Sequence, residues 1–168
     1  MRIEKCELLA RAIFSIVNSQ FITTMTDPRI ATLLGQARWQ ARPERFVLAA
    51  LKPIERRLVL GLLAGVTAPF MQLIAEPDLL TLVLPQSDWH PLKPAFPHAR
   101  VQAPFRVISF DLDLPNDLVG FLAVASRALA DAGVPILAIC GYTKDHILVR
   151  EEHLERALAA LNGAQEGI

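Results

Sequence analysis

The same order of expected elements, namely strand, helix, strand, tight turn and strand, occurs twice along this 168-residue chain. In the second copy, residues 105–113 alternate apolar with polar side chains, and residues 118–132 carry apolar side chains at helical spacing. Its strands are expected over residues 105–113, 134–140 and 146–150, and its helices over residues 118–132 and 151–161. This pattern limits the architecture strongly, because each strand and each helix must bury one face against the others.

The first copy of the order lies in residues 46–84. Its strands are expected over residues 46–51, 69–75 and 79–84, and its helix over residues 54–64. The segment Glu76-Pro-Asp78 has the composition of a tight turn between the last two strands. The duplication predicts an α+β fold of ferredoxin-like split βαβ units in tandem, with antiparallel sheets and helices on one face.

The N-terminal segment, residues 1–45, is expected to be a helical extension of this duplicated core. Apolar side chains in residues 1–24 fall mainly on one side of a helix, and a second short helix is expected over residues 30–40. A later start of the chain stays open, since Met25 precedes Asp27, a good N-cap, and Pro28, which suits a first helical position. Residues 1–24 would then be an over-long start.

Between the two copies, residues 85–104 hold five of the 12 prolines in the chain. Proline has no backbone amide to donate and fixes its own φ, so it interrupts helices and strands. We therefore predict an irregular linker over residues 85–104, which separates a first half at residues 46–84 from a second domain at residues 105–162.

The composition excludes several classes of function. With 17 basic and 17 acidic side chains the net charge is zero, which argues against a dedicated binder of nucleic acid or of an anionic membrane. The two cysteines, Cys6 and Cys140, are too few for a disulfide framework, so the cytoplasm is the expected compartment. Residues 58–75 carry no formal charge, but their glycines and Pro69 indicate a turn and not a membrane span.

The motifs of common catalytic sites do not occur in the sequence. We find no Gly-x-Ser-x-Gly elbow, no phosphate-binding loop, no His-Glu-x-x-His and no Gly-x-Gly-x-x-Gly. We therefore expect no catalysis, no metal site and no cofactor. Cys140 is expected to be a small buried residue and not a nucleophile, because no activating base stands beside it in the sequence.

Residues 105–161 resemble the ACT domain, a small regulatory module that binds amino acids in many metabolic enzymes. The resemblance rests on Asp113-Leu-Pro-Asn-Asp-Leu-Val-Gly120 before the helix, on Ala132-Gly-Val-Pro-Ile136, and on Asp145-His-Ile-Leu-Val149. With a degenerate ACT-like half at residues 46–84, the chain looks like the small stand-alone tandem ACT proteins related to CASTOR-type arginine sensors. This resemblance implies a sensor or regulatory protein that binds an amino acid and has no catalysis of its own. The alternative is an ACT protein that serves only structure or oligomerisation.

An amino-acid ligand needs donors for its carboxylate and acceptors for its ammonium group. The start of the helix at residues 118–132 has unpaired amides, and the absence of a side chain at Gly120 lets a ligand approach closely. The expected donors are the amides of Leu118, Val119 and Gly120, and the expected polar side chains are Asp113, Asn116 and Asp117. The alternative is that Asn116 or Asp117 caps the helix and that Gly120 only packs closely.

A second ACT unit is expected to complete this site with the edge of its strand at residues 134–140. The residues expected at that edge are Ile136 and Leu137. The expected assembly is therefore a homodimer or tetramer that forms through the ACT sheets, with an amino acid as the small-molecule partner and no nucleic acid or membrane.

Overall fold

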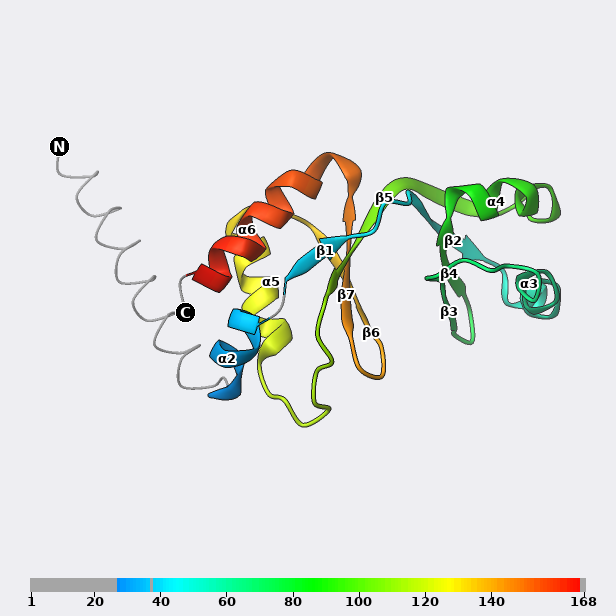
Figure 1. Ribbon diagram of the computed structural model, residues 1–168. Helices are drawn as coiled ribbons and strands as arrows, with labels where there is room; N and C mark the ends of the chain where they lie inside the picture. The colour runs from blue at the N-terminus through cyan, green and yellow to red at the C-terminus, as the bar shows by residue number, and fades with distance from the viewer. Residues whose placement is uncertain (1–26, 37, 167–168) are drawn as a thin grey trace, which may run out of the picture.

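A computed structural model of the chain describes residues 27–36 and 38–166. Its strands form one seven-stranded sheet in the order β3-β4-β2-β5-β7-β6, with β1 pairing to β5 as well (Figure 1). The strands are β1 (Trp39–Ala41), β2 (Phe46–Leu51), β3 (Gln72–Ala75), β4 (Leu80–Pro85), β5 (Arg100–Phe110), β6 (Ile136–Cys140) and β7 (Asp145–Arg150). The helices are α2 (Arg29–Gln36), α3 (Arg56–Leu63), α4 (Gln86–Leu92), α5 (Phe121–Asp131) and α6 (Leu154–Glu166), with 3-10 turns η1 (Pro53–Glu55), η2 (Lys93–Ala95) and η3 (Glu151–His153).

The long strand β5 belongs to two units of the same topology. Its first half pairs antiparallel with β2, and its second half pairs antiparallel with β7 and with β1. The first unit is therefore β2-α3-β3-β4-α4-β5, and the second is β5-α5-β6-β7-α6 with β1 in the place of its fourth strand. In both units the first strand lies between the third and the fourth, which is the split βαβ arrangement predicted from the sequence.

The prediction of an irregular linker at residues 85–104 is wrong. The segment forms α4, η2 and the start of β5, and it completes the first unit beyond residue 84. Buried Trp89 and Phe96, with ring centroids 5.9 Å apart, fix the segment in the core of that unit. Two of the five prolines lie where proline is tolerated: Pro94 is at the start of η2, where an amide is not needed, and Pro104 adjoins the register shift between β5 and β2.

The N-terminal segment is not a separate helical extension in its described part. The predicted helix over residues 30–40 is shorter, since α2 ends at Gln36 and β1 follows, and both pack on the second unit. Trp39 of β1 is buried with its ring centroid 4.8 Å from that of Phe110. Asp27 caps α2 as predicted, because its Oδ1 accepts the amide of Arg29 at 2.9 Å. Residues 1–24, and with them the predicted first helix, lie outside the described residues.

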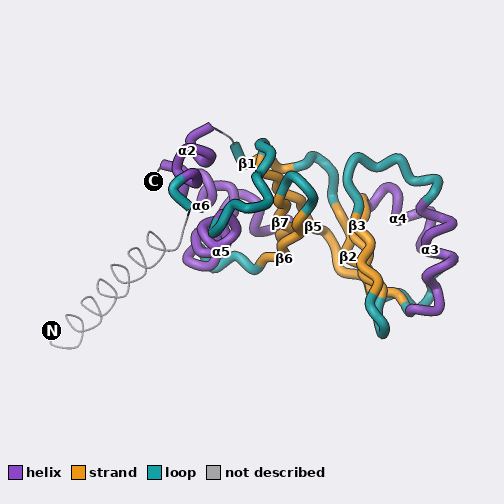
Figure 2. The backbone as a smooth tube through the Cα atoms, turned by 90° about the horizontal axis from the view of Figure 1, so that it is seen from below, coloured by secondary structure: helices purple, strands orange, loops and turns teal. Residues whose placement is uncertain are grey.

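The helices lie on the two outer sides of the molecule, and the strands lie between them. Figures 1 and 2 show α5 and α6 on one side of the strands and α3 and α4 on the opposite side. Each unit thus carries its helices on one face of its strands, as predicted. The helix-free faces share a third apolar cluster, whose members come from both units: Phe46, Val83, Phe105, Val107, Ile139 and Leu148. The sheet therefore curls so that the two helix-free faces meet.

Candidate functional site

The turn before α5 and the turn between β6 and β7 meet at one end of the second unit. They lie at the same end because β7 runs antiparallel to β5, so that Ser109 pairs with His146. The amide of Leu114 also donates to the carbonyl of Thr143 at 2.7 Å and ties the two turns together. A cavity of about 400 Å³ opens between them, lined by the turn before α5, by the first residues of α5 and by residues 140–145. We call it the α5 cavity.

Residues at the start of α5 line this cavity, and their backbone amides have no backbone partner in the described part of the chain. The helix begins at Phe121, and its N-cap is Gly120, whose φ of 98° is a left-handed conformation that side chains disfavour. No side chain caps the helix, so the predicted cap by Asn116 or Asp117 is wrong. Within the described part of the chain, no backbone carbonyl accepts the amides of Phe121, Leu122 or Ala123, all of which line the cavity. The positive end of the helix dipole adds to this electropositive corner.

Of the three amides predicted from the sequence as donors, one already has a partner. The amide of Leu118 is already bonded to the carbonyl of Pro115 at 3.0 Å, within the turn that precedes the helix. The carbonyl of Val119 accepts the amide of Asp27 at 2.9 Å, which ties the turn to the start of α2. The helix starts later than its apolar stripe indicated, because the backbone of Gly120 is left-handed and interrupts the helical conformation there.

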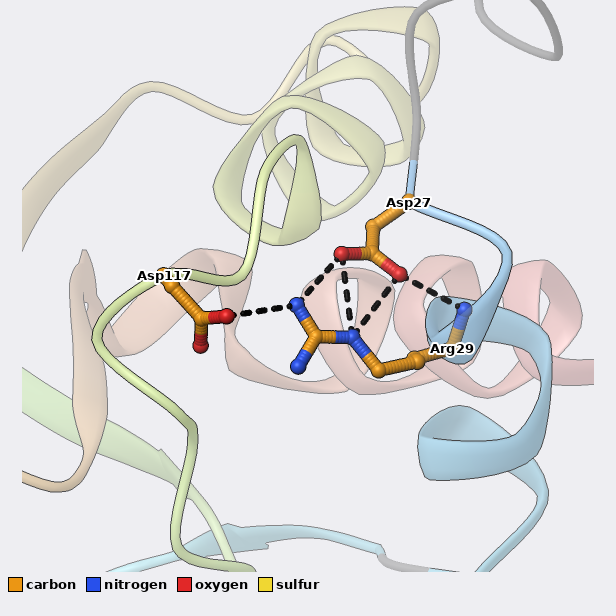
Figure 3. A network of polar contacts seen from close by, with 3 residues as sticks. All are labelled: Asp27, Arg29 and Asp117. Carbon is orange, nitrogen blue, oxygen red and sulfur yellow. Dashed lines mark hydrogen bonds and ion pairs between the residues drawn. The ribbon is translucent and has the colours of Figure 1, made fainter.

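Asp117 points away from the α5 cavity and contacts α2. Figure 3 shows its carboxylate beside the guanidinium of Arg29, with Nη2 and Oδ2 3.1 Å apart. The same guanidinium donates to both carboxylate oxygens of Asp27, and these hydrogen bonds lower the pKa of Asp27. Asp117 therefore joins the turn before α5 to the cap of α2 and does not line the cavity.

Some of the predicted site residues line the α5 cavity, and the others lie away from it. Of the full predicted set, three line the α5 cavity: Asn116, Leu118 and Gly120. The side chain of Asp113 is 74% exposed, and its nearest cation is Lys144, whose Nζ lies 3.9 Å from Oδ1. Ile136 and Leu137 lie at the opposite end of β6 from Cys140, so within one chain they do not reach the cavity. A contribution of this edge from a second copy stays a prediction.

The turn between β6 and β7 supplies the polar groups that the sequence analysis did not include. Lys144 and Asp145 both line the cavity, and they bring a cation and a carboxylate to its wall. The turn requires glycine at position 141, since a Cβ there would lie 2.9 Å from the carbonyl oxygen of Lys144. The antiparallel pairing of the first and third strands places this turn beside the start of the helix, so the predicted topology itself indicated these residues.

Cys140 lies at the rim of the α5 cavity and is exposed, whereas the sequence predicted a buried residue. A hydrogen bond to Asp145, partial burial and the negative charge of Asp145 all raise the pKa of the thiol. The protonated thiol is a poor nucleophile.

Within residues 27–36 and 38–166, no cluster of three or more His, Cys, Asp or Glu side chains has the arrangement of a metal site. No helix within the same residues has both the length and the hydropathy that crossing a bilayer requires.

A comparison with protein families gives a match in the second unit of the fold. Residues 100–163, from the start of β5 into α6, match the family model described as the ACT domain. The whole described fold, with its antiparallel curled sheet and helices, is that of ACT domains, which confirms the predicted fold class. A search among curated protein sequences gives no match.

Similar solved structures come from several bacteria. A protein of unknown function from Vibrio cholerae, described as a possible transport protein, is 26% identical, with a TM-score of 0.60 over 81% of this chain and 95% of its own. A protein from Agobacterium tumefaciens is 18% identical, with a TM-score of 0.57 over 77% of this chain and 89% of its own. The regulatory subunit of aspartate kinase from Thermus flavus is 14% identical, with a TM-score of 0.54 over 76% and 96%. These matches extend over both units of the fold.

Proposed function

We propose that this protein is a regulatory protein that binds a free amino acid in the α5 cavity. The observation that carries the proposal is the set of unpaired amides of Phe121, Leu122 and Ala123 at the wall of that cavity. A ligand carboxylate accepts hydrogen bonds from these amides and is stabilised by the helix dipole. The carboxylate of Asp145, on the opposite wall, accepts from the ligand ammonium group.

The comparisons support a regulatory role for a small-molecule ligand. The ACT family model covers the unit that contains the α5 cavity, and one of the similar solved structures is a regulatory subunit of aspartate kinase. The amide donors and the carboxylate acceptor of the cavity support an amino acid as the class of ligand. The proposal includes no catalysis by the chain itself, a cytoplasmic location and kinship with the stand-alone tandem ACT proteins.

The proposal includes a homodimer or tetramer that forms through strand β6. This strand ends the sheet, so one side of its backbone has no partner strand in the described chain. Leu137 of the strand is 44% exposed although it is large and apolar. Pairing of two β6 strands would satisfy the free backbone groups and bring Ile136 and Leu137 of a second copy to the interface. The alternative function, an ACT protein that only oligomerises, rests on the same edge strand.

Calorimetric titration of the full chain with each of the 20 amino acids tests the proposed ligand class. We expect saturable heat with at least one of them. Exchange of Asp145 to Asn is expected to reduce that affinity at least tenfold, because the ammonium group loses a charged acceptor. Exchange of Asp78 to Asn, in the exposed turn before β4, removes the same charge far from the cavity and is expected to leave the affinity within twofold.

Two outcomes would overturn the proposal. One is that the wild-type protein gives no heat of binding with any of the 20 amino acids at millimolar concentration. The other is unchanged affinity in the Asp145→Asn variant. If no amino acid binds and sedimentation measurements show a dimer, the alternative function holds, and the protein serves only oligomerisation.

A further inference from the structure

A second cavity, of about 250 Å³, opens on the helix-free side of the second unit, between β1, the end of β5 and the start of β7. We call it the Arg42 cavity, because Arg42, which follows β1, is the cation at its wall that lacks an acidic partner. The remaining polar wall comes from Gln40 of β1, Ser109 of β5, Asp111 and, at the start of β7, Lys144 and His146. The carboxylate of Asp111 accepts from Gln40 Nε2 at 3.0 Å and lies 3.7 Å from Lys144 Nζ. The α5 cavity also contacts Lys144, but none of Arg42, Ser109 and His146.

Arg42 is a partly buried cation without a counter-ion in the described residues. Its Nε atom is buried and has no hydrogen-bond partner, and its guanidinium forms no ion pair with a described carboxylate. The nearby Arg106 differs, because its Nη1 lies 3.5 Å from Oε1 of Glu151. Arg106 also holds the backbone of Arg42 in place, since its Nη2 donates to the Arg42 carbonyl at 2.6 Å. A partly buried cation without a partner is costly, so the guanidinium favours an anion at this place.

Aromatic rings hold the guanidinium beside the other polar groups of the cavity. Arg42 Cζ lies 5.1 Å from the ring centroid of Phe70, and the same ring lies 4.8 Å from that of His146. Ser109 Oγ and His146 Nδ1 share a hydrogen bond of 2.8 Å, which fixes both groups at the wall. Lys144 already has a carboxylate neighbour, since its Nζ lies 3.7 Å from Oδ1 of Asp111. The guanidinium of Arg42 is therefore the cation of this wall that is free to pair.

We propose that the Arg42 cavity binds a small oxyanion, of the carboxylate or phosphate type, through the guanidinium of Arg42. The Ser109 hydroxyl is a further donor, with His146 Nδ1–H donating to Ser109 Oγ in their shared hydrogen bond. A planar guanidinium fits both kinds of oxyanion through two parallel hydrogen bonds. The small volume limits the ligand to a few heavy atoms beyond the anionic group. This site is separate from the amino-acid site of the proposed function, and Lys144 is the residue that the two cavities share.

Titration of the full chain with sodium malonate and, separately, with sodium phosphate tests the site, with sodium chloride keeping the ionic strength constant. Binding is followed through the imidazole resonances of His146 and through calorimetry. We expect saturable binding of at least one anion to the wild type and at least tenfold weaker binding to the Arg42→Gln variant. The Arg57→Gln variant, which loses the same charge on the exposed side of α3, is expected to bind within twofold of the wild type. Binding of malonate but not phosphate indicates a carboxylate ligand, and binding of phosphate but not malonate indicates a phosphate-type ligand.

Absence of saturable binding of both anions to the wild type would overturn the site, as would equal affinities of the wild type and Arg42→Gln. If Arg42→Gln does not fold, Ser109→Ala takes its place, with at least threefold weaker binding expected and unchanged affinity as the contrary result. An amino-acid titration of the Arg42→Gln variant distinguishes the oxyanion site from the amino-acid site. Retained heat of amino-acid binding in that variant, together with loss of the oxyanion, assigns the two ligands to two cavities.

Discussion

Exchange of Gly141 to Ala tests whether the turn between β6 and β7 holds the α5 cavity in shape. A Cβ at position 141 would lie 2.9 Å from the carbonyl oxygen of Lys144, and that same carbonyl accepts the Gly141 amide at 2.9 Å. The neighbour is backbone and cannot rotate away as a flexible side chain would, so the turn must shift. Forcing a methyl group into such a place costs about 1–3 kcal/mol. At this chain length each kcal/mol lowers Tm by about 2–4 °C.

The matched control for this variant is Gly61→Ala. Gly61 lies within α3, and a Cβ there meets nothing within 4 Å. Alanine in a helix is more favourable than glycine by about 0.5–1 kcal/mol, so this variant is expected to be more stable than the wild type. Urea denaturation of the three proteins, read by far-UV circular dichroism, measures both changes. Equal stability of Gly141→Ala and wild type would refute the argument that the turn is closely packed.

The remaining predictions concern pH, the cap of α2 and the segment rich in proline. Burial and the charges of Arg42 and Lys144 lower the pKa of His146 below its ordinary 6.5, against the opposite influence of Asp145. The unfolded chain therefore takes up a proton before the folded one, and the free energy of unfolding should fall as pH drops below about 6.5. His146→Gln should flatten this slope in urea titrations at several pH values, and an unchanged slope would contradict the assignment. Asp27→Asn should lower Tm at neutral pH, and the difference from the wild type should shrink as the pH falls below about 4. Hydrogen bonds from Arg29 lower the pKa of the Asp27 carboxyl, and the contribution of the carboxylate is lost when it is protonated. Trp89→Ala should cost about 3–5 kcal/mol in the same denaturation assay, whereas a linker residue would cost almost nothing.

The sequence predicts the class of this fold because its periodic elements are long and regular. The stripe of apolar residues in α5 and the runs that became β6 and β7 lie within a few residues of their predicted places. Composition does not predict the structure of residues 85–104, because the effect of a proline depends on its position in the element and not on the number of prolines. Trp89 and Phe96 are the apolar pair that indicated a core segment there. Strand β1 was missed because three residues are too short for a periodic pattern.

For the predicted site residues, local features follow from the sequence and long-range contacts do not. Unpaired amides at the start of a helix are a local feature, and the sequence around Gly120 indicates such a helix start. The place where the helix starts depends on the φ angle of that glycine, and the partner of Asp117 depends on a contact with Arg29, 88 residues away in the chain. Such long-range contacts have no local pattern. The lack of an acidic partner for Arg42 also has no local pattern, because it depends on how far the described carboxylates lie from the guanidinium in the folded chain.

Amide resonances of ¹⁵N-labelled protein during titration with the amino acid that gives the largest heat test the central claim most directly. We predict that the amides of Phe121, Leu122 and Ala123 move furthest and saturate together with those of residues 141–145. Shifts confined to other parts of the chain, with these three amides unmoved at saturation, would contradict it.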